Sequence, residues 1–208
     1  MIGIFGGTFD PVHFGHLRPA LEVQQALGLN EVRFIPAGQP PHREMPNATT
    51  PQRLSMLRAA VEDQPGFVVD EREVRREGPS YMVDTLTSLR EEVGQLPLCL
   101  ILGYDAFLGL PGWHQWHRLI ELAHLVITHR PGWNHDDLDD TLQSLVKQHE
   151  RAFERLAEQA AGGLVFVPVT QLDISATSIR EQIRAGQDIR YLLPDTVNRI
   201  ISEQKLYR

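Results

Sequence analysis

Residues 1–16 read MIGIFGGTFDPVHFGH: a short apolar run, two glycines and two histidines, followed by a segment with helical spacing. The run at 2–5 is continuous rather than alternating, which is typical of a strand covered on both faces. Five similar runs follow it, at 32–35, 67–69, 98–102, 124–128 and 164–169. Because segments with helical spacing separate these runs, the sequence predicts an α/β fold with a doubly wound, mostly parallel sheet.

Apolar residues at helical spacing predict the helices. The first stripe starts at Leu17 and stops at Gly28, a residue that suits the left-handed position after a helix. Pro51 opens a second helix, and a third begins near Ser80. The stretch 136–161 predicts one or two more helices, with acidic residues in the first turn, where the helix dipole favours them.

Length and composition narrow the class of protein. With 208 residues, 42% hydrophobic and 23% charged, the chain fits one globular domain over residues 1–208, with 136–161 as a helical segment inside it. No apolar stretch is long enough to span a membrane. We expect a cytoplasmic protein, because no basic leader precedes the first strand and Cys99 is the single cysteine. The net charge of −7 argues against nucleic acid as a partner. The oligomeric state has no signal in the sequence.

The segment after the first strand predicts a phosphate site. Gly6 and Gly7 allow backbone N–H groups to approach an anion closely. His13 and His16 lie three residues apart at the start of a helix, beside its positive dipole end, and add two donors. We expect Gly15, between them, to leave room for a ligand against the backbone.

Common nucleotide-binding motifs are absent. The first glycines do not form G-x-G-x-x-G, and no glycine precedes a lysine as a Walker A loop requires. Among the 20 basic residues only Lys147 and Lys205 are lysines, so binding of phosphate must depend on arginine, which grips phosphate oxygens in pairs.

The stretch GGTFDPVHFGH resembles the nucleotidyltransferase superfamily, whose mark is H-x-G-H after the first strand, and within it the bacterial nicotinate-nucleotide adenylyltransferases. The resemblance implies a Rossmann-like nucleotidyltransferase fold. It also implies transfer of the adenylyl group of ATP to nicotinate mononucleotide, giving deamido-NAD and pyrophosphate in NAD biosynthesis. In this reading His13 and His16 are catalytic, and the loop residues that bind ATP are Gly6, Gly7, Thr8 and Phe9.

A second block, ISATSIR at 174–180, resembles the family segment that binds the triphosphate at another helix N-terminus. The resemblance implies that Ser175 and Thr177 bind ATP and that Arg180 both binds ATP and takes part in catalysis. The hydroxyls and N–H groups of a first helical turn, together with an arginine a few residues later, can donate hydrogen bonds to an anion. The alternative for Ser175 is an ordinary helix cap.

The run 98–102 is followed by Gly103-Tyr104-Asp105, which resembles the G-x-D that contacts the ATP ribose in the family. We expect the carboxyl ends of the first and fourth strands to meet at a topological switch point, where open α/β sheets bind ligands. Gly103 and Asp105 are therefore candidate ATP-binding residues. Asp105 could instead cap a helix.

Three segments resemble the parts of the family that bind the mononucleotide. Trp113 resembles the aromatic residue that stacks on the pyridine ring, and Tyr81 and Thr85 lie in a matching P-S-Y…T-L segment. Arg43, in Pro40-Pro41-His42-Arg43, and Arg130 are candidates for its phosphate, with a solvated surface charge as the alternative for each. Several relatives carry tyrosine where His114 stands, so its role stays open, and the spacing of Trp116 favours a place in the core.

The resemblance implies Mg²⁺ that arrives with ATP, and we expect no dedicated metal site. A zinc reading of the histidines at 114, 117, 124 and 129 is disfavoured because no cysteine lies near them. The alternatives are an adenylyltransferase for nicotinamide mononucleotide or phosphopantetheine, and a non-catalytic nucleotide sensor on the same fold. A redox enzyme lacks its glycine fingerprint here, and an aminoacyl-tRNA synthetase fragment lacks its lysine loop.

Overall fold

The computed structural model describes residues 1–40, 45–130 and 138–208. Six strands form one sheet in which every pair is parallel, in the order β3-β2-β1-β4-β5-β6. They are β1 (Ile2–Gly7), β2 (Glu31–Pro36), β3 (Phe67–Val69), β4 (Leu98–Gly103), β5 (His124–His129) and β6 (Leu164–Pro168). All six apolar runs are strands, so the predicted doubly wound sheet is confirmed.

The helices lie between the strands and after the last one. They are α1 (Phe14–Leu27), α2 (Thr50–Val61), α3 (Arg72–Arg75), α4 (Met82–Val93), α5 (Tyr104–Leu108), α6 (Leu119–Leu122), α7 (Asp140–His149), α8 (Ala176–Arg184) and α9 (Asp195–Glu203), with 3₁₀ turns η1 (Leu110–Gly112), η2 (Trp116–Arg118) and η3 (Phe153–Glu158). Gly28 ends α1 in the left-handed conformation, with φ 60°, and Pro51 lies in the first turn of α2, both as predicted. Among the described residues of the stretch 136–161, one α-helix (α7) and one 3₁₀ turn (η3) are present.

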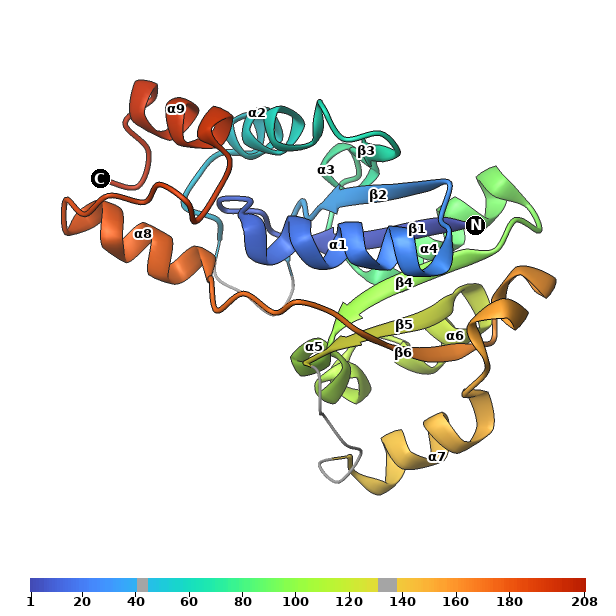
Figure 1. The fold of residues 1–208 in the computed structure, drawn as a ribbon. Coiled ribbons are helices and arrows are strands. Elements are labelled where there is room, and N and C mark those ends of the chain that lie inside the picture. The colour runs from blue at the N-terminus through green and yellow to red at the C-terminus, as the bar shows by residue number, and fades with distance from the viewer. Residues whose placement is uncertain (41–44, 131–137) are drawn as a thin grey trace.

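The sheet separates two apolar cores, because successive side chains of a strand point to opposite faces. In β4, Cys99 and Ile101 face the core that α1, α2, α8 and α9 cover. Leu98, Leu100 and Leu102 face the core that α4, α5, α6 and α7 cover. Figure 1 shows α1 crossing the near face of the sheet and α4 lying behind it. Helices on both faces explain why the strands read as continuous apolar runs.

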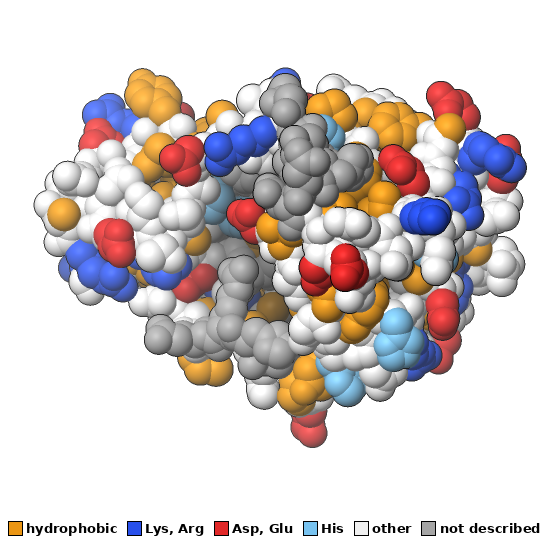
Figure 2. Space-filling model, turned by 90° about the horizontal axis from the view of Figure 1, so that it is seen from below, with side chains coloured by type: hydrophobic (Ala, Val, Ile, Leu, Met, Phe, Trp, Pro, Cys, Tyr) orange, Lys and Arg blue, Asp and Glu red, His pale blue; other side chains and the backbone are white. Residues whose placement is uncertain are grey.

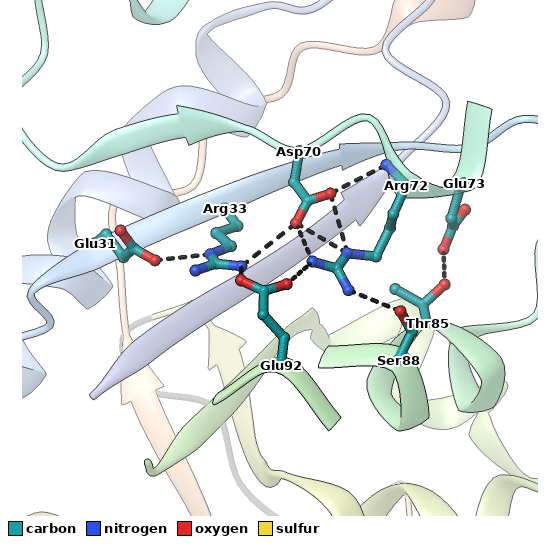
Figure 3. A network of polar contacts seen from close by, with 8 residues as sticks. All are labelled: Glu31, Arg33, Asp70, Arg72, Glu73, Thr85, Ser88 and Glu92. Atoms are coloured by element: carbon teal, nitrogen blue, oxygen red, sulfur yellow. Dashed lines mark hydrogen bonds and ion pairs between the residues drawn. The ribbon is translucent and has the colours of Figure 1, made fainter. Parts of the chain in front are cut away.

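Ion pairs fasten α3 and α4 to the β2–β3 side of the sheet (Figure 3). The Arg33 side chain of β2 donates to Glu31 at 2.7 Å and to Glu92 of α4 at 2.8 Å. Arg72 of α3 donates to Asp70 at 2.7 Å and to Glu92 at 2.6 Å. Glu92 therefore pairs with an arginine from β2 and an arginine from α3, and these contacts help to hold α4 in position against the sheet.

The topology reverses between β1 and β4. These strands are neighbours, with Ile2 opposite Leu98. The strand that follows β1 in sequence, β2, lies on one side of this pair within the sheet, and the strand that follows β4, β5, lies on the other. Their carboxyl ends thus form the switch point at which open α/β sheets bind ligands. On the face that Figure 2 shows, acidic and basic side chains are interspersed among apolar ones. Within the described ranges, the helices are too short or too polar to cross a membrane.

Candidate active site

The two histidines meet at the start of α1. His13 is the residue before the helix and His16 is in its first turn, and their ring centroids lie 3.8 Å apart. The backbone N–H of His13 approaches Nδ1 of His16 at 3.4 Å. His13 is only 4% exposed, and burial lowers its pKa to about 4. Its imidazole is therefore neutral at pH 7 and can offer one N–H as a donor.

The first turn of α1 packs against the chain that precedes α8 and against the loop before α9. The backbone N–H of Phe14 donates to the carbonyl oxygen of Leu192 at 3.0 Å. A Cβ on Gly15 would lie 3.0 Å from the carbonyl oxygen of Ile174 and 2.9 Å from Nδ1 of His13. The approach of a ligand to the backbone at Gly15 stays a prediction. The absent side chain makes room for the protein itself.

The end of β1, at Gly6 and Gly7, and the loop that follows it present main chain rather than large side chains. Gly6 is exposed, and a Cβ there would lie 2.7 Å from Cε of Met82. The carbonyl oxygen of Gly7 accepts from Ala37, and Thr8 is half-buried. Phe9 has a φ of 51° and is 1% exposed as a residue, and its ring packs edge-on to His16 at 5.2 Å between centroids. Phe9 therefore belongs to the core, and its contact with ATP stays a prediction.

The second motif lies next to this loop. Nη1 of Arg180 donates to the carbonyl oxygen of Asp10 at 2.7 Å, and Nη2 donates to Thr177 Oγ1 at 3.2 Å. Ser175 caps α8, because its Oγ accepts the backbone N–H of Ser178 at 3.1 Å. The capping alternative for Ser175 is thus confirmed. The two motifs, 170 residues apart in sequence at Asp10 and Arg180, are in direct contact.

The third motif follows the neighbouring strand. Gly103 ends β4, is exposed, and is the residue that precedes α5. Asp105 lies exposed in the first turn of α5, and no side chain caps this helix, so the alternative role of Asp105 as a helix cap is wrong. Because β4 pairs with β1 in parallel, Gly103 lies at the same end of the sheet as Gly6 and Gly7, where both strands finish.

Aromatic residues lie between α4 and η2. Tyr81, just before α4, stacks on His114 with ring centroids 4.3 Å apart and an angle of 33°. His114, whose role the sequence left open, is therefore half of an aromatic pair. Trp113 and Trp116 are half-buried against the core of the α4–α7 face, which confirms the core position of Trp116. Trp113 retains partial exposure.

Thr85 is a buried residue of α4. Its side chain is 0% exposed, and its hydroxyl donates to Glu73 Oε1 at 2.6 Å (Figure 3). The same hydroxyl accepts from Arg76 at 3.2 Å. Burial raises the pKa of the Glu73 carboxyl. The Thr85 hydroxyl thus already serves a buried hydrogen-bond network that supports the start of α4, and a place for Thr85 beside a mononucleotide stays a prediction.

The remaining candidates lie at the periphery. Arg130 is exposed, and its Nε donates to Gln171 at 2.9 Å. Arg43 is outside the described residues. His124 is buried and accepts the backbone N–H of Gly163 at 2.9 Å, which is an ordinary structural role. Across residues 1–40, 45–130 and 138–208, no three His, Cys, Asp or Glu side chains gather as a metal site.

The sequence reasoning missed three residues that hold the loop after β1. Asp10 accepts from Tyr207, and Arg53 of α2 donates to the carbonyl oxygens of Thr8 and Ala37. All three are at least nine-tenths buried. Asp10 lay within the quoted motif, but Arg53 and Tyr207 had no local signal, because their partners are far away in the sequence.

The family comparison defines the class of protein first. Residues 4–182 match the model of the cytidylyltransferase-like family, which is a nucleotidyltransferase fold and agrees with the sheet and the H-x-G-H loop. A relative from Methylococcus capsulatus is 51% identical over 208 residues, covering 100% of this chain and 99% of its own. One from Halorhodospira halophila is 51% identical over 209 residues, covering 99% and 94%. Both carry the name "Probable nicotinate-nucleotide adenylyltransferase".

The chain belongs to the nicotinate-nucleotide adenylyltransferases, and it is an enzyme of NAD biosynthesis. The fold comparison agrees. Nicotinic acid mononucleotide adenylyltransferase from Plasmodium falciparum, solved in complex with NaAD, superposes with a TM-score of 0.75 at 15% identity and covers 99% of this chain and 96% of its own. At that identity the likeness concerns the fold alone.

Proposed function

We propose that adenylyl transfer from ATP to nicotinate mononucleotide takes place at the carboxyl edge of β1 and β4, with His13, His16 and Arg180 at the reacting phosphates. One observation carries this proposal. The 2.7 Å hydrogen bond from Arg180 to the Asp10 carbonyl joins the loop with the two histidines to the start of α8. The two candidate phosphate-binding segments thus form one surface beside Gly103.

The reaction needs no nucleophile from the protein. A phosphate oxygen of the mononucleotide attacks the α-phosphorus of ATP, a new P–O bond forms, and the bond to the leaving pyrophosphate breaks. Catalysis then rests on positioning and on stabilisation of the charge that develops on the phosphate oxygens. A neutral His13 can donate one hydrogen bond to such an oxygen, His16 can donate another, and Arg180 supplies positive charge.

ATP in this proposal lies along the edge of the sheet. The main chain at Gly6 and Gly7, together with Thr8 and the backbone of Phe9, faces the phosphates, and Asp105 beside Gly103 accepts from the ribose. Ser175 and Thr177 add the first turn of α8, where N–H groups favour an anion. Mg²⁺ enters as part of the MgATP substrate. The described side chains form no carboxylate cage, which suits an ion held mainly by phosphates and water.

The mononucleotide in this proposal lies on the β4 side. Trp113 and the Tyr81–His114 pair offer aromatic surface to the pyridine ring, and Arg130 is positioned for its phosphate only if it leaves Gln171. We also propose that the protein works in the cytoplasm, where its buried free Cys99 stays reduced.

The defining experiment is release of pyrophosphate from ATP with a panel of acceptors. We expect kcat/KM for nicotinate mononucleotide to exceed that for nicotinamide mononucleotide by at least about 100-fold, because donors arranged for a carboxylate are left unpaired by the amide. Equal use of acid and amide would contradict the nicotinate assignment. Turnover of phosphopantetheine alone would identify a different adenylyltransferase, and nucleotide binding without any release of pyrophosphate would indicate a sensor.

The catalytic role of the histidines is tested separately. His16→Ala should lower kcat by roughly 10²–10³-fold, the cost of removing a donor to developing charge. KM for ATP should change much less, because the main chain of the loop remains. A kcat close to that of the unaltered enzyme would remove His16 from the mechanism.

A further inference from the structure

The segment after α9 returns to the loop after β1. Lys205 and Tyr207 adopt positive φ values of 52° and 65°, which turns the chain back toward the sheet. The hydroxyl of Tyr207 then donates to Asp10 Oδ1 at 2.7 Å. Tyr207 is 8% exposed and Asp10 is 4% exposed, so the contact is shielded from water. Residues 204–208 are called the return segment below.

Asp10 is the point where four parts of the chain converge. Besides the bond from Tyr207, its carboxylate accepts the backbone N–H groups of Asn47, at 2.7 Å, and Ala48, at 3.1 Å. Its carbonyl oxygen accepts Nη1 of Arg180. Asp10 thereby joins the return segment, the chain leading into α2, and α8, and it lies three residues before His13.

A buried arginine restrains the same loop from the other side. Arg53 is 1% exposed, and its guanidinium donates to the Thr8 carbonyl at 2.7 Å and to the Ala37 carbonyl at 2.8 Å. Burial and the nearby Asp10 carboxylate raise the pKa of Tyr207 far above its usual range. The phenol therefore stays protonated and acts only as a donor to Asp10.

We propose that Tyr207 is a positioning residue for adenylyl transfer: through Asp10, it fixes the backbone between Thr8 and His13, and with it the placement of His13 and Arg180. The proposal rests on the proposed function of those two residues. The match to the cytidylyltransferase-like model ends at residue 182, whereas the match to the relative from Methylococcus capsulatus includes the return segment. The competing view is that Tyr207 only packs α9 against the core.

Tyr207→Phe removes the hydroxyl and keeps the ring. We expect kcat to fall about 10-fold, because small displacements of aligned groups cost that much or more, while KM for ATP and for nicotinate mononucleotide stays within about twofold. Tyr191→Phe is the matched control, since Tyr191 is 86% exposed and should leave kcat unchanged. A Tyr207→Phe enzyme with unaltered kcat and only a lower Tm would overturn the proposal.

Asp10→Ala removes the acceptor of the same bond from the loop side. Measured alone, with an expected fall in kcat of about 10-fold or more, it serves if Tyr207→Phe does not fold. On the proposal, adding Tyr207→Phe to Asp10→Ala changes kcat by less than about twofold, because the acceptor of the Tyr207 hydroxyl is already gone. Equal losses in both backgrounds would show that Tyr207 does not act through Asp10.

The imidazole NMR signals of His13 and His16 give a readout that needs no turnover. They should shift in Tyr207→Phe and not in Tyr191→Phe, and unchanged signals would count against the positioning role. A wild-type enzyme that releases no pyrophosphate with nicotinate mononucleotide would refute the proposed function, whereas the NMR comparison would still decide the role of Tyr207.

Discussion

A histidine next to phosphate is often pictured as a cation, but burial makes His13 neutral. Its side chain is enclosed by the first turn of α1 and by the loop after β1, and its pKa of about 4 leaves it uncharged throughout the physiological range. In the proposed function, Arg180 rather than His13 therefore supplies positive charge to the phosphates. This division explains why a chain with only two lysines can still handle two highly charged substrates.

The depressed pKa of His13 makes stability depend on pH in a defined window. Between pH 6.5 and about 4 the unfolded chain binds a proton at this residue and the folded chain does not. The contribution of His13 is therefore complete above pH 6.5 and is lost as the pH falls to about 4, by about 3 kcal/mol in total.

Urea unfolding at several pH values measures this effect. The free energy of unfolding of the unaltered enzyme should fall more steeply from pH 6.5 to 4 than that of His13→Gln. His117→Gln, at an exposed histidine, should keep the full slope. Identical slopes for His13→Gln and the unaltered enzyme would mean that His13 is solvated rather than buried.

At the scale of elements, the position of α1 depends on the absence of a side chain at Gly15. We expect Gly15→Ala to push the first turn away from Ile174 and to lower both kcat, by about 10-fold, and stability, by about 1–3 kcal/mol. The reason is that the Ile174 carbonyl and the His13 ring lie within 3.0 Å of the new Cβ.

The control is Gly109→Ala, where a Cβ would meet its closest neighbour at an ordinary 3.7 Å. Thermal melts and steady-state kinetics on both variants should separate them clearly. If Gly15→Ala behaves like Gly109→Ala, the two segments are not as tightly packed as the structure shows.

The strands and the longer helices were the features of this protein that could be predicted best from the sequence. Each apolar run became a strand because burial on both faces demands continuous apolar residues, and this signal is local. The end of α1 at Gly28 was predictable for the same reason, since one residue carries the conformation. The short helices α3, α5 and α6 lack enough turns to show a period, and the sequence reasoning did not find them.

The site was predictable only where motifs marked it. The structure brings the segment of His13 and His16 together with that of Arg180, and the catalytic roles of these residues stay predictions. The motif reading could not tell which side chains were already engaged. Thr85 lies in a motif that resembles a ligand-binding segment, yet its hydroxyl donates a hydrogen bond to Glu73, twelve residues earlier. Tyr207 meets Asp10 across 197 residues, a separation that no periodicity spans.

At the scale of the whole molecule, α7 tests whether the stretch 136–161 is part of one domain. Leu142 is 1% exposed in the core of the α4–α7 face. We expect Leu142→Ala to cost about 2–5 kcal/mol of stability, and kcat and KM to stay unchanged well below Tm, because the helix lies away from the candidate site.

Calorimetry decides the question of domains. A single transition that moves as a whole to lower temperature in Leu142→Ala is expected for one cooperative domain. Thr141→Ala, at an exposed position of the same helix, should shift it little. Two separate transitions, only one of them sensitive to Leu142→Ala, would show that this segment folds as a unit of its own.

The contact between Asp10 and Tyr207 forms late in synthesis, because Tyr207 is made long after Asp10. During synthesis at roughly 5–20 residues per second, about 10–40 s pass between the appearance of Asp10 and that of a partner 197 residues later. Through that interval the growing chain can form β1 and its neighbours but not the finished loop. On the proposed role of Tyr207, the enzyme reaches its full rate of ATP use only once the return segment has emerged and docked.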